Sequence, residues 1–338
     1  MKLLFSNTKN KHLLAPQYVD ELQKSGVDVK SSYFFDITAF FQKSLTGKIV
    51  FKLFPSLIYF LCNTSLLRDV KKYQPDMVVI FKGMEIVPKT LQKLKSRGVF
   101  LINYNPDHPF QYFTKASGND NVKNSIPLYD LHITYSYQIK KEMNLSYPHA
   151  TVEVLPFGYP TYFDEISHQS NDIKKICFLG YGDEHRASVI KAILDLGYEI
   201  DIYGENWKKY LSPTKKLNLF PSVYGEKYFR KLADYRIQLN LLRTHNFKSH
   251  NMRSFEIPSC GGVMLSVHTK EQHNFFREGK EAFYYDDATE LLKKIDQIMK
   301  MPIYEAEQIR NQARKRAKIH SYHHRSQKLM QLINQYFA

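Results

Sequence analysis

The sequence predicts an α/β protein made of two consecutive domains, each a parallel sheet covered by helices on both faces. Three observations lead to this prediction. The chain has 338 residues, which is too long for one ordinary domain and suits two. Short apolar runs alternate with segments of helical spacing along the whole chain. A stretch that contains prolines, a glycine and then the polar run HQSND interrupts this alternation at residues 156–172.

The first half of the chain begins the alternation. Residues 2–6 form a short apolar run that predicts a strand, and residues 12–25 have a helical spacing that ends at Gly26. The further predicted elements are an extended segment at 28–35, a helix at 49–73, a buried strand at 77–81, a helix at 87–97, strands at 99–104 and 131–135, a helix at 136–144 and a strand at 152–155. Strands separated by helices in this way pair in parallel.

The second half repeats the pattern. The predicted strands are 175–179, 199–203, 237–242, 263–266 and 283–285, and the predicted helices are 184–196, 228–235, 252–259, 288–299, 303–318 and 323–336. We therefore expect an N-terminal domain at residues 1–160, a C-terminal domain at 173–320, and a helix at 321–338 that can cross back to the first domain. Two such Rossmann-like domains would face a central cleft at the carboxyl ends of their strands.

The net charge of +15 indicates an anionic partner, which can be nucleic acid, an anionic membrane or a phosphorylated substrate. Residues 1–160 carry 20 Lys and Arg against 12 Asp and Glu, and the rest of the chain carries 28 against 21. Because the positive charge is spread evenly, it is less typical of a face that reads DNA. Nucleic acid therefore stays the weaker of these partners.

The three cysteines are far apart and odd in number, which indicates buried thiols in a reducing compartment, with no disulfide framework and no metal spacing. They are Cys62, Cys177 and Cys260. The N-terminus MKLLFSNTKNK turns polar too soon for a signal peptide. We expect a cytoplasmic protein, with peripheral contact at the anionic inner face of the membrane left open.

The most apolar stretch, residues 49–67, is interrupted by Lys52, Pro55 and Asn63. These interruptions make it a poor membrane span. A buried helix is the favoured interpretation, and a helix on the membrane surface is the alternative.

The segment KICFLGYGDEHR, residues 175–186, runs from a strand through a glycine-containing turn into a helix. Such a turn presents backbone N–H groups and the positive end of a helix to a phosphate. Arg186 falls in the first helical turn, where it opposes the helix dipole unless an anion is bound. The alternative is a plain connection between a strand and a helix.

The same segment also has part of a dinucleotide-binding fingerprint. Gly180 and Gly182 supply its first two glycines, and Asp201 could act as its ribose-binding acid. His185 stands where the third glycine belongs, so an NAD-dependent oxidoreductase is the weaker interpretation.

The segment HNMRSFEIPSCGGVMLS, residues 250–266, places Arg253 and Glu256 three residues apart at the start of a short helix. A carboxylate at this place can accept hydrogen bonds from both hydroxyls of a ribose, and an arginine beside it can hold phosphate oxygens. The alternative is an ion pair on a solvated helix face.

The segment LINYNPDHPFQYF, residues 101–113, places Asp107 and His108 directly after a buried strand. An acid in such a loop can serve as a general base. The alternative is a turn residue ahead of Pro109.

The run from Arg253 to Gly262, RSFEIPSCGG, resembles the donor-site signature of the CgeB-like, spore-maturation-type glycosyltransferases within the group 1 GT-B class. Further segments are similar to that family in order and spacing: PDMVVIFKG (75–83), VLPFGYPTYF (154–163), the FLGYG loop with Arg186, IYGENW (202–207) and EAFYYDDATELLKKI (281–295). The resemblance covers nearly the whole chain and is most specific in its second half.

The resemblance implies a metal-independent hexosyltransferase with a nucleotide-sugar donor, a UDP- or GDP-sugar, on the C-terminal domain. Glu256 would bind the ribose, while Arg186 and Arg253 would hold the diphosphate. The implied donor-binding residues are Gly180, Tyr181, Gly182, Arg186, Tyr203, Gly204, Asn251, Arg253, Ser254, Phe255 and Glu256. The acceptor would be a glycan or glycolipid in polysaccharide or glycolipid synthesis, and no metal or other cofactor is expected.

The stereochemical outcome stays open. Lys248 stands where group 1 retaining enzymes usually carry a second acid, eight residues before the ribose glutamate. The RxxE spacing and the Asp107 loop are also similar to bacteriophage DNA β-glucosyltransferases, which invert. That likeness implies Asp107 as the base, with His108 as the alternative, and it allows DNA as the acceptor. A non-catalytic relative that binds sugar nucleotides is a further alternative.

Overall fold

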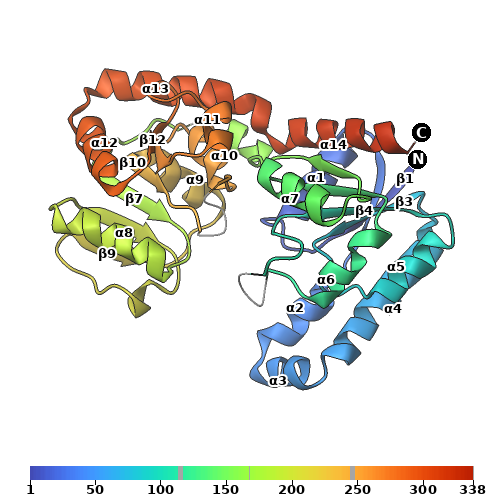
Figure 1. Ribbon diagram of the computed structural model, residues 1–338. Coiled ribbons are helices and arrows are strands. Elements are labelled where there is room, and N and C mark those ends of the chain that lie inside the picture. The colour runs from blue at the N-terminus through green and yellow to red at the C-terminus, as the bar shows by residue number, and fades with distance from the viewer. Residues whose placement is uncertain (113–116, 167, 244–247, 338) are drawn as a thin grey trace. The chain divides into compact units, whose positions relative to one another are not determined.

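The computed structural model describes residues 1–112, 117–166, 168–243 and 248–337. The chain divides into two compact units (Figure 1). One unit comprises Met1–Pro156 together with Tyr322–Ala338, and the other comprises Phe157–Ser321. Each unit holds one six-stranded sheet, and all the strand pairs described in the two sheets are parallel. The predicted α/β class with two Rossmann-like sheets is confirmed.

The sheet of the first unit has the strand order β2-β1-β3-β4-β5-β6. The strands are β1 (Lys2–Ser6), β2 (Asp28–Ser32), β3 (Met77–Phe81), β4 (Phe100–Asn105), β5 (Leu131–Thr134) and β6 (Val152–Val154). The helices are α1 (Leu14–Lys24), α2 (Phe35–Lys43), α3 (Leu45–Leu53), α4 (Pro55–Tyr73), α5 (Pro88–Lys95), α6 (Asp120–Ser125), α7 (Tyr137–Ser146) and α14 (Tyr322–Tyr336). Helix α14 packs on α1, with the rings of Tyr18 and Tyr322 at 5.5 Å.

The sheet of the second unit has the order β12-β11-β10-β7-β8-β9. Its strands are β7 (Ile173–Leu179), β8 (Ile200–Tyr203), β9 (Leu217–Phe220), β10 (Tyr235–Asn240), β11 (Met264–Val267) and β12 (Phe283–Tyr285). Its helices are α8 (Glu184–Asp195), α9 (Gly225–Asp234), α10 (Arg253–Ser259), α11 (Lys270–Phe275), α12 (Ala288–Lys300) and α13 (Ile303–Ala317). This is the strand order of nucleotide-binding Rossmann sheets, in which the order of the strands switches direction between β7 and β10.

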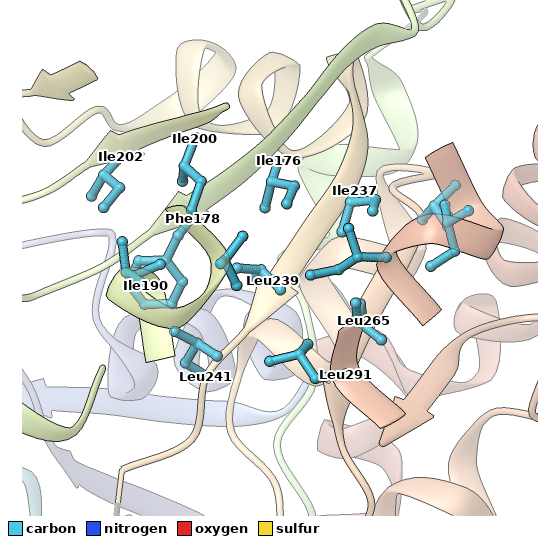
Figure 2. Close-up of a cluster of buried hydrophobic side chains, with 14 of the residues drawn as sticks. Ile176, Phe178, Ile190, Ile200, Ile202, Ile237, Leu239, Leu241, Leu265 and Leu291 are labelled. Atoms are coloured by element: carbon cyan, nitrogen blue, oxygen red, sulfur yellow. The ribbon is translucent and has the colours of Figure 1, made fainter. Parts of the chain in front are cut away.

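The core of the second unit lies between this sheet and its helices (Figure 2). Alternate residues of one strand point to the same face. Pairs from β7, β8 and β10 therefore form a continuous apolar layer, against which α8 and α12 pack. The residues concerned include Ile176, Phe178, Ile200, Ile202, Ile237, Leu239, Ile190 and Leu291. This packing fixes the loops that leave the carboxyl ends of β7, β8 and β10.

The single helix predicted at residues 49–73 is wrong. The structure has two helices, α3 and α4, which meet at an angle of 93° around Phe54. Pro55 lacks an N–H group and restricts the residue before it, so the chain can start a new helix there and cannot continue the old one. The sequence prediction also missed α2, α6, α11 and β9, which are short elements without a clear apolar period.

Candidate functional site

A pocket of about 310 Å³ opens at the carboxyl ends of β7 and β8 in the second unit. It falls in the size range of small-molecule sites, and it lies beside the reversal point of the sheet, where ligands of Rossmann folds bind. Four tyrosines, one carboxylate and one arginine give it an aromatic, partly charged wall. The lining residues are Leu179, Gly180, Tyr181, Tyr203, Glu205, Ser222, Val223, Tyr224, Tyr228 and Arg253.

Arg253, the first residue of α10, forms one wall of this pocket. A Cβ atom on Gly180 would lie 3.0 Å from Nη1 of Arg253, so the glycine lets the guanidinium approach the loop closely. Nε of Arg253 is buried and has no hydrogen-bond partner among the described residues. Buried donors are nearly always paired, so an unpaired guanidinium nitrogen at a pocket wall indicates a place for an acceptor.

Glu256 lies one helical turn after Arg253 on the same face of α10. Its Oε2 accepts a hydrogen bond of 2.7 Å from the hydroxyl of Tyr228, a pocket-lining residue on α9. Desolvation raises the pKa of the Glu256 carboxyl, while the hydroxyl of Tyr228 and the charge of Arg253 lower it. A carboxylate in this setting gains from additional hydroxyl donors, which a ribose supplies.

Arg186 lies near the same loop, and its side chain turns inward. It is 3 % exposed, its Nε and Nη2 donate to the carbonyl of Leu241 at 3.1 and 2.8 Å, and its Nη1 donates to the carbonyl of Tyr181 at 3.0 Å. It therefore ties the loop after β7 to the segment after β10. This geometry indicates that Arg186 positions the loop, and the expectation that it also holds the diphosphate stays a prediction.

The charge of Arg186 still acts on the site. Burial, followed by the nearby charges of Arg253 and Arg243, lowers the pKa of Arg186 to about 9. Asp183 caps α8 and lies 3.4 Å from Nη1 of Arg186, but it is partly exposed and offsets this positive charge incompletely. Arg186 and Arg253 both lie over the ring of Phe178, at 5.5 and 5.4 Å. The two positive charges act on each other, and an anion near both would be favoured.

The predicted glycines act through close packing. A Cβ on Gly204 would lie 2.0 Å from the carbonyl oxygen of Gly180, so the loops after β7 and β8 touch only because neither carries a side chain there. Gly182 packs in the same way against Trp207, whose Nε1 donates to the Gly180 carbonyl at 2.8 Å. Tyr203 stacks on Phe220 at 4.7 Å. These contacts shape the pocket floor.

Asn251, Ser254 and Phe255 are committed to packing. The amide of Asn251 donates to Asn240 Oδ1 at 2.8 Å, and its Oδ1 accepts from the backbone of Ser254 at 3.1 Å. Ser254 is 1 % and Phe255 0 % exposed, on the side of α10 that faces the core. These contacts fix the start of α10, and the expectation that the three residues also contact the donor stays a prediction.

Asp201, the acid considered for an NAD ribose, already accepts hydrogen bonds from protein side chains. It accepts hydrogen bonds of 2.8 Å from Asn218 and 2.7 Å from Tyr235, and it is buried. The arrangement does not favour the dinucleotide interpretation. Within the described ranges, no group of three or more His, Cys, Asp or Glu side chains is placed to hold a metal ion.

Asp107 and His108 follow β4 in the first unit. Asp107 is partly exposed, and its Oδ2 lies 2.6 Å from Nζ of Lys82, which follows β3. His108 is 7 % exposed; its Nδ1 accepts from the backbone of Gln111 at 3.1 Å, and its Nε2 lies 2.8 Å from Glu142. Burial lowers the pKa of His108, although Glu142 opposes this effect. The lone pair of Nδ1 is already used to accept a hydrogen bond from the backbone N–H of Gln111, so His108 stabilises the loop. Asp107 is therefore the better candidate base.

The sequence interpretation missed Tyr228, Glu205 and Glu85. Tyr228 of α9 and Glu205, which follows β8, line the pocket, and only the fold shows that they lie on the same pocket as Arg253. Glu85 follows β3; its Oε2 is buried without a partner among the described residues, and burial raises its pKa to about 6. An acid four residues after a buried strand is a signal that could have identified Glu85.

Residues 186–331 match the sequence model of a family described as "Glycosyl transferase-like". No curated protein sequence matches the chain.

Solved structures with the same fold cover nearly the whole chain. A glycosyltransferase from Rickettsia africae ESF-5 has 13 % identity and a TM-score of 0.67, covering 99 % of this chain and 98 % of that one. Sucrose-phosphate synthase from Thermosynechococcus elongatus has 10 % identity and a TM-score of 0.67, covering 100 % and 99 %. The UDP-GlcNAc 2-epimerase of Neisseria meningitidis, bound to UDP-GlcNAc, has 13 % identity and a TM-score of 0.56, covering 99 % and 100 %. At these identities the likeness shows the fold, and together with the match over residues 186–331 it supports a glycosyltransferase of the GT-B fold.

Proposed function

We propose that the chain transfers a hexose from a UDP- or GDP-sugar to a hydroxyl of a glycan or glycolipid, as a member of the CgeB-like group of GT-B glycosyltransferases. The nucleoside diphosphate part of the donor occupies the pocket of the second unit. The observation that carries this proposal lies on α10. Arg253 lines the pocket with a buried Nε that has no partner among the described residues, and Glu256, one turn later, accepts a hydrogen bond from the pocket-lining Tyr228.

The charges of the pocket suit a diphosphate leaving group. Negative charge develops on the leaving diphosphate during sugar transfer, and preorganised cations nearby stabilise it most when they are partly desolvated. Arg253 would bind the phosphate oxygens, and Arg186 would add positive potential from behind the loop while it holds Tyr181 in place. These two arginines would supply the charge that a divalent metal supplies in other transferases, so we expect a reaction without a metal cofactor.

The ribose and the base would use the remaining polar wall. Glu256 would accept from the ribose hydroxyls, and the Tyr228 hydroxyl keeps its carboxylate oriented. The rings of Tyr181, Tyr203 and Tyr224 offer flat surfaces for the base. The Neisseria epimerase, a protein of this fold bound to UDP-GlcNAc, supports such a donor.

The acceptor step would need a base, and we assign this role to Asp107. Its ion pair with Lys82 orients the carboxylate. In an inverting transfer, Asp107 would remove the proton of the acceptor hydroxyl as the oxygen attacks the anomeric carbon and the nucleoside diphosphate leaves. DNA remains the alternative acceptor, since a net charge of +15 permits it.

A thermal-shift screen of the purified chain with UDP, GDP, ADP and CMP tests the nucleotide site, because a ligand that binds the folded state raises its melting temperature. We expect stabilisation by UDP or GDP that Arg253→Gln removes. Arg230→Gln is the matched control, since Arg230 is an exposed arginine of the same unit, paired with Glu226. The lack of any nucleotide-dependent shift in the intact protein would refute the proposal.

Incubation with UDP- and GDP-hexoses, followed by measurement of released UDP or GDP, tests the catalytic part. We expect slow release without an acceptor, and faster release with glycolipid or glycan acceptors than with duplex DNA. Nucleotide binding without release or transfer in any mixture would indicate a non-catalytic relative.

A further inference from the structure

Helices α2, α3 and α4 of the first unit carry a row of exposed apolar side chains. Eight large apolar residues that are at least 36 % exposed fall within residues 40–61. They are Phe40, Leu45, Ile49, Leu53, Phe54, Leu57, Phe60 and Leu61. We call these residues, together with Lys43, Lys48 and Lys52, the α2–α4 surface. Concentrated apolar exposure of this kind marks an interaction site on a soluble domain.

Helix α3 contributes least to the core of the unit. None of its nine residues is buried, although Val50 and Phe51 are partly covered. Leu45, Ile49 and Leu53 recur every four residues, so they form one apolar stripe along the helix, and they are 76 %, 50 % and 63 % exposed. A nine-residue helix that leaves such a stripe in water gains little from its own fold and gains more from an apolar partner.

The three helices that carry this surface pack against one another. A Cβ on Gly47 would lie 2.1 Å from the Phe41 carbonyl, so α3 packs closely on α2. Phe51 of α3 meets Tyr59 of α4 at 6.3 Å with the rings edge-on. Figure 1 shows α2, α3 and the start of α4 gathered at one end of the first unit, beyond its sheet. The exposed side chains therefore extend from a folded element that projects from the domain.

The charge of the segment identifies the partner. Residues 37–67 contain three lysines and no Asp or Glu, and Lys43, Lys48 and Lys52 are exposed. Apolar side chains flanked by cations, without acids, are the pattern of helices that lie in the interface of an anionic bilayer. A second copy of the chain docked on the same surface would bring lysines against lysines, which disfavours self-association.

A transmembrane arrangement is inconsistent with the core. Among the described residues no single helix is long and apolar enough to cross a bilayer, and α3 with α4 passes that test only as a bent pair. The other face of α4 is committed to the sheet: Ile58, Cys62, Leu66 and Val70 are 0 to 4 % exposed. Only the outer face of α4 is therefore available to lipid.

We propose that the α2–α4 surface docks this protein on an anionic lipid bilayer, with its apolar side chains in the headgroup region and its lysines against the lipid phosphates. The proposal is independent of the nucleotide site. It bears on function in one way: a docked transferase would meet an acceptor that is anchored in the membrane.

Co-sedimentation of the full chain with vesicles of phosphatidylcholine, with and without phosphatidylglycerol, tests docking. We expect binding to the anionic vesicles that weakens as ionic strength rises. Leu45→Asp should lower the partition coefficient at least about tenfold, because a charge replaces an inserted apolar side chain. Leu145→Asp is the matched control: Leu145 is an equally exposed leucine of the same unit, at 75 % against 76 %, outside the surface.

The lysines are tested by the double substitution Lys48→Glu and Lys52→Glu, which should abolish the preference for anionic vesicles. A cooperative thermal unfolding transition close to that of the wild type checks that each variant is folded. Wild-type protein that stays in the supernatant with anionic vesicles would overturn the proposal, as would equal binding by Leu45→Asp and Leu145→Asp. A lipid-free dimer in sedimentation velocity that Leu45→Asp dissolves would also overturn it, in favour of a second copy as the partner.

Discussion

The hydroxyl of Tyr228 donates a 2.7 Å hydrogen bond to Oε2 of Glu256, joining α9 to α10 at the wall of the pocket. The two residues are 28 positions apart in the chain, and the sequence pattern pairs Glu256 only with Arg253. The bond holds the carboxylate in one orientation, and desolvation raises its pKa. A carboxylate that is oriented and desolvated in this way favours a ligand with hydroxyl groups that donate hydrogen bonds to it.

The ribose assignment predicts a selective loss in Glu256→Ala. Charge-assisted hydrogen bonds contribute about 1.5–3 kcal/mol each, so affinity for UDP or GDP should fall roughly ten- to a hundredfold. Calorimetric titration with the ribonucleotide and its 2′-deoxy analogue separates the causes. Wild-type protein should prefer the ribonucleotide, and Glu256→Ala should bind both equally. A preference that survives in the variant would place the ribose elsewhere. Glu226→Gln, an exposed glutamate of α9, is the control.

The diphosphate assignment predicts that Arg253→Gln removes the preference for a nucleoside diphosphate over the free nucleoside. The guanidinium would supply a charge-assisted contact to phosphate, and its Nε has no other partner among the described residues. We expect a loss of roughly tenfold or more in affinity for the diphosphate and little change for the nucleoside. Equal losses for both ligands would mean that the substitution disturbs the pocket generally.

Arg186 should behave differently from Arg253. It donates to the carbonyls of Leu241 and Tyr181, so Arg186→Met leaves the buried Leu241 carbonyl without this donor at a cost of about 1–3 kcal/mol. We expect a clear fall in the free energy of unfolding, measured by urea denaturation, whereas Arg230→Met should change it by less than about 0.5 kcal/mol. An unchanged stability with a large loss of nucleotide affinity would instead make Arg186 a direct ligand.

Asp107 and His108 can be separated by kinetics. Asp107→Asn removes the proposed base, so kcat should fall about a hundredfold or more while nucleotide affinity is unchanged. His108→Phe removes the contacts to Gln111 and Glu142 and should lower stability by about 1–3 kcal/mol with a smaller effect on kcat. The reverse result would identify His108 as the base.

The raised pKa of Glu85 predicts that the free energy of unfolding depends on pH. Burial raises its pKa from the usual 4.5 to about 6, so the folded state binds the proton more tightly than the unfolded state. The contribution of Glu85 to the free energy of unfolding should therefore fall by about 2 kcal/mol in total as pH rises from about 4.5 to about 6, and then stay level. Glu85→Gln should be up to about 2 kcal/mol more stable than wild type at pH 7.5 and no more stable at pH 4.5.

Denaturation of both proteins at the two pH values measures this difference. A variant that is less stable than wild type at both values would show that Glu85 is ionised and paired in the folded state. The rate of UDP or GDP release by the same variant shows whether Glu85 contributes to turnover in addition to Asp107.

The alternation of apolar runs and helical spacing determined most of the fold. A buried parallel strand needs a continuous apolar run, so β3 and β4 could be read directly from the sequence. The break at Phe54 was missed because α3 and α4 have one continuous apolar composition, and the prediction treated Pro55 only as an interruption of a membrane span. Short elements such as α6 and β9 depend on tertiary contacts, since they bury too few residues to leave a pattern.

The sequence by itself determined which residue types meet on one helix face, and for that reason it identified Arg253 and Glu256, three positions apart on α10. Only the tertiary structure decided the direction of each side chain. It turned Arg186 inward to the Leu241 carbonyl and placed Tyr228 against Glu256. The physical reason is that local spacing fixes neighbours within one element, whereas burial and hydrogen bonding between distant elements depend on how the sheet brings their loops together.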